Sequence, residues 1–181
     1  MKILDRVPYS SEATFVSAPG GTVRVKPYQI VVVVSVSLPA LLEWDPRTPC
    51  FPAILDTGNN HNLSITRGRL LRWAGLQPEA LRISGAMRDS QQRIPLHAAS
   101  VWLQKNRPGE RALREQEPHP LKLQQGIAVY PDDIGPRLPV LGLRALTQNQ
   151  LHVAIDPEQM RVSLRNPGWG TRILRWFGRL L

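Results

Sequence analysis

The sequence of 181 residues contains a single cysteine, Cys50, and few aromatic side chains. One cysteine excludes an intrachain disulfide framework and any metal site built from several cysteines. No recognisable histidine-containing motif lies near Cys50, so we expect a core or strand-edge cysteine rather than a nucleophile or a redox switch. Three Phe, three Tyr and five Trp leave most core packing to Val, Leu and Ile, which favours a β-rich core.

Long apolar runs are also lacking. Residues 1–21 contain no continuous apolar segment, so no secretory signal is expected. The most apolar stretch, residues 29–38, is too short for a transmembrane helix and is rich in β-branched residues, which predicts a buried strand. A cytoplasmic location is therefore the expectation. No metal-ligand spacing is found among the four histidines, which are His61, His97, His119 and His152.

Negative charge is scarce relative to positive charge. The formal net charge is +9 and the isoelectric point is about 10.8, so anionic surfaces would attract the chain nonspecifically. The sequence nevertheless lacks a basic helix with base-reading residues, an aromatic stacking platform and a zinc motif. We therefore predict no specific nucleic-acid partner and interpret the excess charge as a solvated surface.

One stretch indicates chemistry. An apolar run from Phe51 to Leu55 predicts a buried strand, and it ends abruptly in Asp56, Thr57 and Gly58. Gly58 permits a sharp turn. A carboxylate at this position is costly to desolvate unless it is hydrogen-bonded or shares a proton with a partner. Two such aspartates facing each other could activate a water molecule; the alternative is an aspartate that caps a strand-to-turn junction.

Residues 53–58, followed by the apolar Leu63-Ser64-Ile65, resemble the active-site loop of retroviral-type (retropepsin-like) aspartic proteases. A second stretch, Val140-Leu141-Gly142, resembles the other hallmark of that family, two apolar residues and a glycine that lead into a short helix. The resemblance covers about residues 23–164. It implies an all-β, barrel-like acid protease subunit with one or two short helices, one lobe per chain and an active site completed by homodimerisation.

The resemblance also implies an activity, that of an aspartic endopeptidase acting on polypeptide substrates without metal or cofactor. Because the chain has a single Asp-Thr-Gly, each of two subunits would contribute one Asp56 on a two-fold axis. Thr57 would link the two loops, and Gly58 would allow close backbone approach. The family usually has Ala or Ser where this chain has Asn59, whose amide could either donate to Asp56 or crowd the carboxylate pair.

A hairpin with a polar tip is expected over residues 83–94. In the family, the segment between the first helix and the second motif supplies the flap that closes over substrate. The flap candidates here are Ser84, Gly85, Ala86 and Met87. The stretch lacks the glycine-rich tip of retroviral flaps, so a plain exposed hairpin is the alternative.

The remaining elements follow from local patterns. We expect an irregular N-terminal tail over residues 1–21, a protease domain over 22–165 and, within it, a surface loop or insertion over 104–125. Thr66 and Gly75 predict the two ends of a helix over residues 67–74. A second short helix is expected over 143–150. Strands are expected at 22–26, 30–38, 51–56, 62–65, 98–103, 126–130, 151–156 and 160–164.

A C-terminal tail, residues 166–181, lies outside the resemblance. At helical spacing, residues 169–181 place apolar side chains on one face and arginines on another. Such a tail could lie on an anionic membrane, which would make the protein membrane-peripheral, or pack on the body or across a dimer. The alternative function is accordingly a catalytically inactive dimerising module that binds through its basic surface or this tail. Asn59 and the atypical hairpin favour that alternative, whereas the two intact motifs favour the enzyme.

Overall fold

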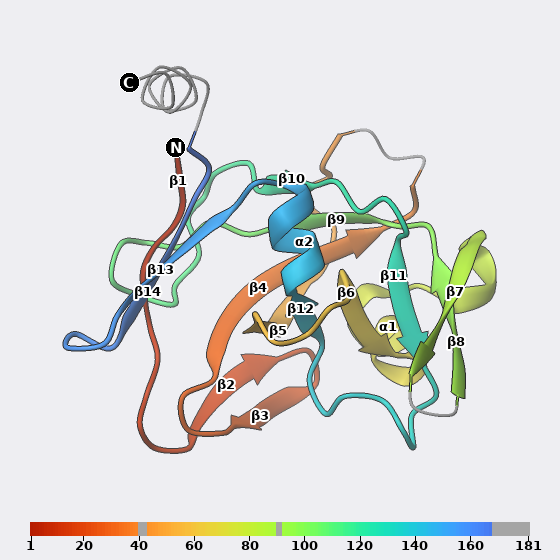
Figure 1. The fold of residues 1–181 in the computed structure, drawn as a ribbon, viewed down its shortest axis with the longest axis horizontal. Coiled ribbons are helices and arrows are strands. Elements are labelled where there is room, and N and C mark those ends of the chain that lie inside the picture. Colours follow the sequence, from red (N-terminus) through yellow and green to blue (C-terminus); the bar gives the residue numbers. More distant parts are fainter. Residues whose placement is uncertain (40–42, 90–91, 168–181) are drawn as a thin grey trace, which may run out of the picture.

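The computed structural model describes residues 1–39, 43–89 and 92–167. The predicted amphipathic tail, residues 169–181, lies outside the described residues. Within them the chain is mostly β-strand with two short α-helices and open sheets, which confirms the expected all-β class (Figure 1). In this part of the chain, neither helix has the length and apolar character that crossing a membrane requires.

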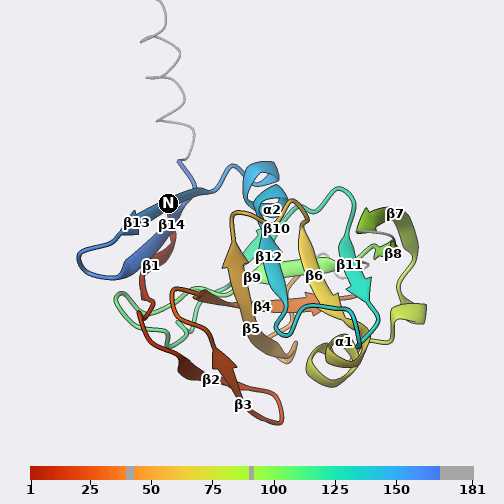
Figure 2. The ribbon, with the colours of Figure 1, turned by 60° about the horizontal axis from the view of Figure 1, so that its bottom comes forward.

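Nine of the described strands form one sheet, called here the main sheet. Their order across it is β10-β9-β4-β5-β12-β6-β11-β8-β7 (Figures 1 and 2). The strands span β4 Ile30–Ser37, β5 Cys50–Asp56, β6 Leu63–Thr66, β7 Ile83–Asp89, β8 Gln92–His97, β9 Ser100–Leu103, β10 His119–Leu121, β11 Ile127–Tyr130 and β12 Val140–Gly142. Every strand expected between residues 30 and 142 is therefore present, and β10 and β12 are additions.

The middle of the main sheet is built by strands that are distant in sequence. β4 and β5 are antiparallel, as the apolar runs predicted. β12 lies between β5 and β6, parallel to β5 and antiparallel to β6. Its register places Gly142 opposite Asp56. The two stretches singled out in the sequence are therefore neighbours in the sheet.

Helix α1, Arg67–Ala74, begins and ends at the predicted residues. The Thr66 hydroxyl accepts a hydrogen bond from the Arg69 backbone N–H at 3.4 Å, and Gly75 adopts the left-handed conformation at φ 69°. Asp132 adds a second cap by accepting a bond from the Gly68 N–H at 2.9 Å, and its hydrogen bonds with Thr66 and Gly68 lower the pKa of that carboxyl. Helix α2, Leu143–Gln148, directly follows Gly142, as predicted.

Residues 1–21 are not irregular, so that expectation is wrong. They form β1, Lys2–Pro8, and β2, Thr14–Ala18; β2 pairs with β3, Gly21–Val25. β1 joins β14, Arg161–Arg165, which also pairs with β13, His152–Asp156. The pairing of β1 shifts register twice and Arg6 has a positive φ of 51°, so the apolar side chains do not alternate regularly. Because of this irregularity, the alternation of apolar and polar residues that predicts a strand is absent from the sequence of β1.

The expected insertion, residues 104–125, is largely exposed but firmly anchored. Its anchor is Asn106, which is only 5% exposed. The Nδ2 group of Asn106 lies 2.8–2.9 Å from the carbonyl oxygens of Asp5, Arg107 and Glu110, and its Oδ1 accepts a bond from the Asp5 N–H at 2.8 Å. Gly109 donates a further backbone bond to the Asp5 carbonyl oxygen. The insertion therefore covers the outer edge of β1.

This anchor predicts a stability effect. The change Asn106→Ala removes these hydrogen bonds and leaves buried backbone groups unpaired, so we expect the free energy of unfolding to fall by at least about 2 kcal/mol. Gln116→Ala, at an exposed position in the same insertion, is the matched control and should change it by under about 0.5 kcal/mol. Urea unfolding followed by circular dichroism measures both. Equal midpoints for the two variants would contradict an anchoring role.

Candidate active site

Asp56 is the last residue of β5 and faces solvent. The residues before it, Ala53 to Leu55, are buried, whereas Asp56, Thr57 and Gly58 are exposed. The Gly58 N–H donates a hydrogen bond to Asp56 Oδ1 at 2.9 Å, and the Asn59 N–H donates to the Asp56 carbonyl oxygen at 3.3 Å. The turn therefore holds one carboxylate oxygen at the end of a rigid strand and leaves the group open to a reactant or a partner.

The second motif supports this loop through backbone hydrogen bonds. The Gly142 N–H donates to the Asn62 carbonyl oxygen at 2.9 Å, and the Leu143 N–H donates to the Asn59 carbonyl oxygen at 2.7 Å. A Cβ atom at Gly142 would lie 2.3 Å from the His61 carbonyl oxygen and 2.6 Å from that of Asn59. Only glycine permits this approach. Val140 and Leu141, the other members of the motif, pair with β5, and Leu141 is fully buried.

Asn59 has a role that the sequence did not predict. Its Oδ1 accepts a hydrogen bond from the His61 backbone N–H at 2.9 Å. Among the described residues, its side chain makes no hydrogen bond to Asp56. Of the two alternatives, donation to the Asp56 carboxylate is therefore not seen among the described residues; the side chain instead bonds within the loop that approaches Gly142.

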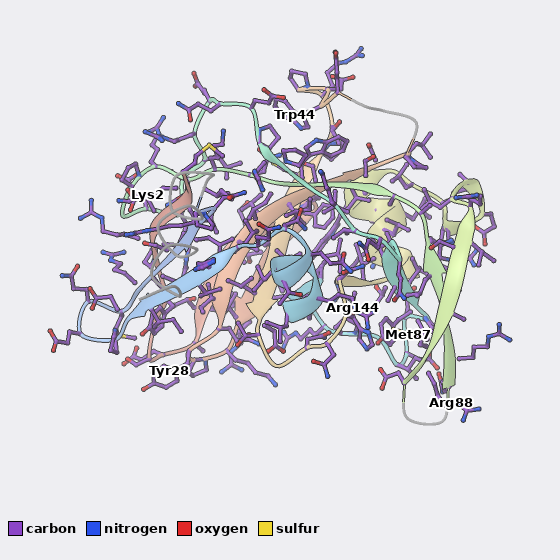
Figure 3. The ribbon with its side chains drawn as sticks, turned by 45° about the horizontal axis from the view of Figure 1, so that its top comes forward. Lys2, Tyr28, Trp44, Met87, Arg88 and Arg144 are labelled. Carbon is purple, nitrogen blue, oxygen red and sulfur yellow. The ribbon has the colours of Figure 1, made fainter. Side chains whose placement is uncertain are left out.

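The expected hairpin is present as β7 and β8, and its turn, residues 90–91, lies outside the described residues. The flap candidates Ser84, Gly85, Ala86 and Met87 lie along β7, before this turn. The Ser84 hydroxyl donates to the Gln125 carbonyl oxygen at 2.9 Å, which holds the base of the hairpin. Met87 lies closer to the loop: it shares a small recess with His61 and Arg144, and Figure 3 shows Met87 and Arg144 near each other.

Two further side chains connect the hairpin to the body of the protein. The Tyr130 hydroxyl, at the end of β11, donates to Asp89 Oδ2 at 2.9 Å, at the last residue of β7. Burial, and then the bond to Asp89, raise the pKa of Tyr130 to about 12, so it stays a donor at neutral pH. The sequence signal for this contact was weak, a tyrosine at the end of an apolar strand.

The histidine nearest the loop, His61, is half-buried. Burial lowers its pKa, Asp89 opposes that shift and Arg144 adds to it. His61 therefore favours the neutral form beside the loop. In the described part of the chain, no group of three or more His, Cys, Asp or Glu side chains is arranged to hold a metal ion.

The close approach at Gly142 is testable. The change Gly142→Ala forces a methyl group against two backbone carbonyl oxygens, which cannot move without disrupting the loop, so we expect the free energy of unfolding to fall by about 3 kcal/mol. Gly85→Ala is the matched control, because the new methyl group would meet only Leu96 Cδ1 at 3.7 Å. Urea unfolding compares the two. If Gly142→Ala lowers the free energy of unfolding no more than Gly85→Ala does, the backbone approach at Gly142 is not tight.

Comparisons of the chain with protein-family models, with curated proteins and with solved structures found no match. The functional assignment therefore depends on the geometry around Asp56. That geometry is an exposed carboxylate at the end of a buried strand, in a loop bonded to the second motif.

Proposed function

We propose that the chain is a retropepsin-like aspartic endopeptidase whose active site forms between two identical subunits. The main support is the exposed Asp56 carboxylate, held by the Gly58 N–H and set beside Gly142. A single carboxylate cannot act as both general base and general acid around one water molecule. If a two-fold axis lies next to the loop, Asp56 of the second subunit supplies the second carboxylate, and no other residue is needed.

The exposure of the loop is consistent with such an axis. Asp56, Thr57 and Gly58 are all accessible in the single chain, and the apolar side chain of Leu143, next to Gly142, is 37% exposed. Residues that meet a partner copy are expected to be accessible in this way. In the proposed dimer, Thr57 of each subunit would contact the opposite loop, and the main sheet would form one lobe of the enzyme.

The proposed chemistry needs only the two carboxyl groups and water. Two carboxyl groups within hydrogen-bond distance share one proton, because both cannot ionise cheaply. The ionised group removes a proton from water as the water oxygen bonds to the scissile carbonyl carbon. The other group donates its proton to the carbonyl oxygen. On collapse, the C–N bond breaks, the first group protonates the leaving nitrogen, and a diol hydroxyl returns a proton to the second.

The β7–β8 hairpin is the part of the fold proposed to cover bound substrate. It projects from the edge of the main sheet, and Met87 approaches the active-site loop at the recess beside His61 and Arg144. The bond between Tyr130 and Asp89 supports the end of β7. The hairpin is therefore held at both ends of β7, by Ser84 at its base and by Asp89 near its turn.

The decisive variant is Asp56→Asn, which preserves the size of the side chain but removes the acid–base group. We expect cleavage of an unfolded protein substrate, measured from acidic to neutral pH, to fall at least about a hundredfold. Asp133→Asn makes the same chemical change at an exposed turn position and should leave the rate unchanged. If the wild type forms folded dimers but does not cleave, the enzyme is rejected in favour of a non-catalytic dimerising module.

A mixing experiment tests whether the site is shared between subunits. Excess Asp56→Asn protein added to the wild type should trap wild-type subunits in mixed dimers with one carboxylate and suppress cleavage. The same excess of Asp133→Asn protein, which keeps Asp56, should add activity instead. Unchanged wild-type cleavage in the presence of Asp56→Asn, with subunit exchange verified by labelled protein, would mean that one chain suffices.

A further inference from the structure

A cleft of about 640 Å³ lies at the opposite end of β5 from Asp56. It is open to solvent on one side and is lined by residues of β1, of the β2–β3 hairpin, of β4 and β5, and of the insertion after β9; Figures 1 and 2 show the hairpin beneath β4 and β5. Most of its lining residues are apolar and include Val7, Phe15, Val16, Val31, Phe51 and Leu113. The volume is within the range of about 300–1,000 Å³ typical of small-molecule sites.

Arg111 is the one charged residue among the described residues that line the cleft. Its Nε donates to the Pro8 carbonyl oxygen at 3.2 Å, and no carboxylate in the described part of the chain forms an ion pair with it. Burial lowers the pKa of its guanidinium. A partly buried cation without a counter-charge is unfavourable, so the position favours an anionic ligand group.

The other polar residues of the cleft, Ser17, Cys50, Gln104 and Asn106, are uncharged. Asn106 is saturated by its bonds to Asp5, Arg107 and Glu110. The Gln104 Nε2 group donates to the Ser35 hydroxyl at 2.8 Å. Cys50 is exposed, but the neighbouring protein partly desolvates its thiol and raises the pKa, so the thiol stays neutral at physiological pH. The cleft therefore combines one cationic group with an apolar interior.

We propose that this cleft binds a free fatty acid, with the hydrocarbon chain along the apolar wall and the carboxylate on the Nη groups of Arg111. One anionic head and a long apolar body match the two features of the cleft, and planar guanidinium groups bind carboxylates in a bidentate manner. The cleft begins at the Cys50 end of β5, and Pro52 is about 13 Å along the strand from Asp56. Binding is therefore independent of the proposed protease activity.

Calorimetric titration of the full chain with dodecanoate and with the uncharged dodecan-1-ol, both below their aggregation limits, tests the site. We expect one dodecanoate per chain, bound at least about tenfold more tightly than the alcohol, because a charge-assisted hydrogen bond to Arg111 is lost with the alcohol. Shortening the acid should weaken binding about fourfold for each methylene removed. Equal affinities for acid and alcohol would overturn the assignment of the head group to Arg111.

Variants separate this site from general attraction to a basic protein. Arg111→Gln should weaken dodecanoate binding at least about tenfold and leave dodecan-1-ol unchanged. Arg114→Gln, at an exposed position in the same insertion, is the control with the same loss of charge and should bind both ligands like the wild type. Ala18→Phe narrows the cleft and should weaken the binding of both dodecanoate and dodecan-1-ol.

A second Arg111 variant and the binding stoichiometry complete the test of the dodecanoate site. If Arg111→Gln does not fold by circular dichroism, Arg111→Lys keeps the charge without the planar guanidinium, and it should retain dodecanoate binding within about tenfold. Binding of several equivalents of dodecanoate per chain would overturn the proposal. So would a loss of dodecanoate affinity in Arg114→Gln equal to that in Arg111→Gln, since both results indicate attraction to the net positive charge. Asp56→Asn should bind dodecanoate like the wild type whether or not the protease proposal holds.

Discussion

The structure depends on the close backbone approach between Gly142 and the loop that follows Asp56. A strand of three residues, β12, is inserted between β5 and β6, and it bonds to both neighbours. Because Gly142 has no Cβ, the carbonyl oxygens of Asn59 and His61 can lie against its Cα. The Asp56 carboxylate is therefore positioned at the end of a strand by the Gly58 N–H, in a loop that backbone hydrogen bonds join to β12 and α2.

The elements around this centre serve to hold it in place. Phe51, at the start of β5, packs against Trp73 of α1 with ring centroids 5.9 Å apart, so the helix supports the strand that carries Asp56. α1 is itself capped by Thr66 and by Asp132 from the turn after β11. The candidate site and the apolar cleft therefore share one strand, with the Asp56 carboxylate at one end and the cleft that contains Arg111 at the other.

The sequence was informative where a local physical rule applies. The apolar run before Asp56 predicted β5, and Thr66 and Gly75 predicted both ends of α1, because capping needs only neighbouring residues. It was uninformative for β1, whose bulged register breaks the period of two, and for Asn106, whose partner Asp5 is far away in the chain. The link between Tyr130 and Asp89 was missed for the same reason.

The sequence by itself determined the strand-rich class, most of the elements after residue 21 and the sharp turn after Asp56, since these follow from side-chain period and from glycine at a turn. Tertiary structure alone decided that Gly142 lies opposite Asp56 and that Asn59 braces its own loop instead of donating to the carboxylate. It also placed Arg111 beside an apolar cleft, with no carboxylate of the described residues paired to it. These arrangements arise from strand pairing and side-chain placement between distant segments, which no local pattern encodes.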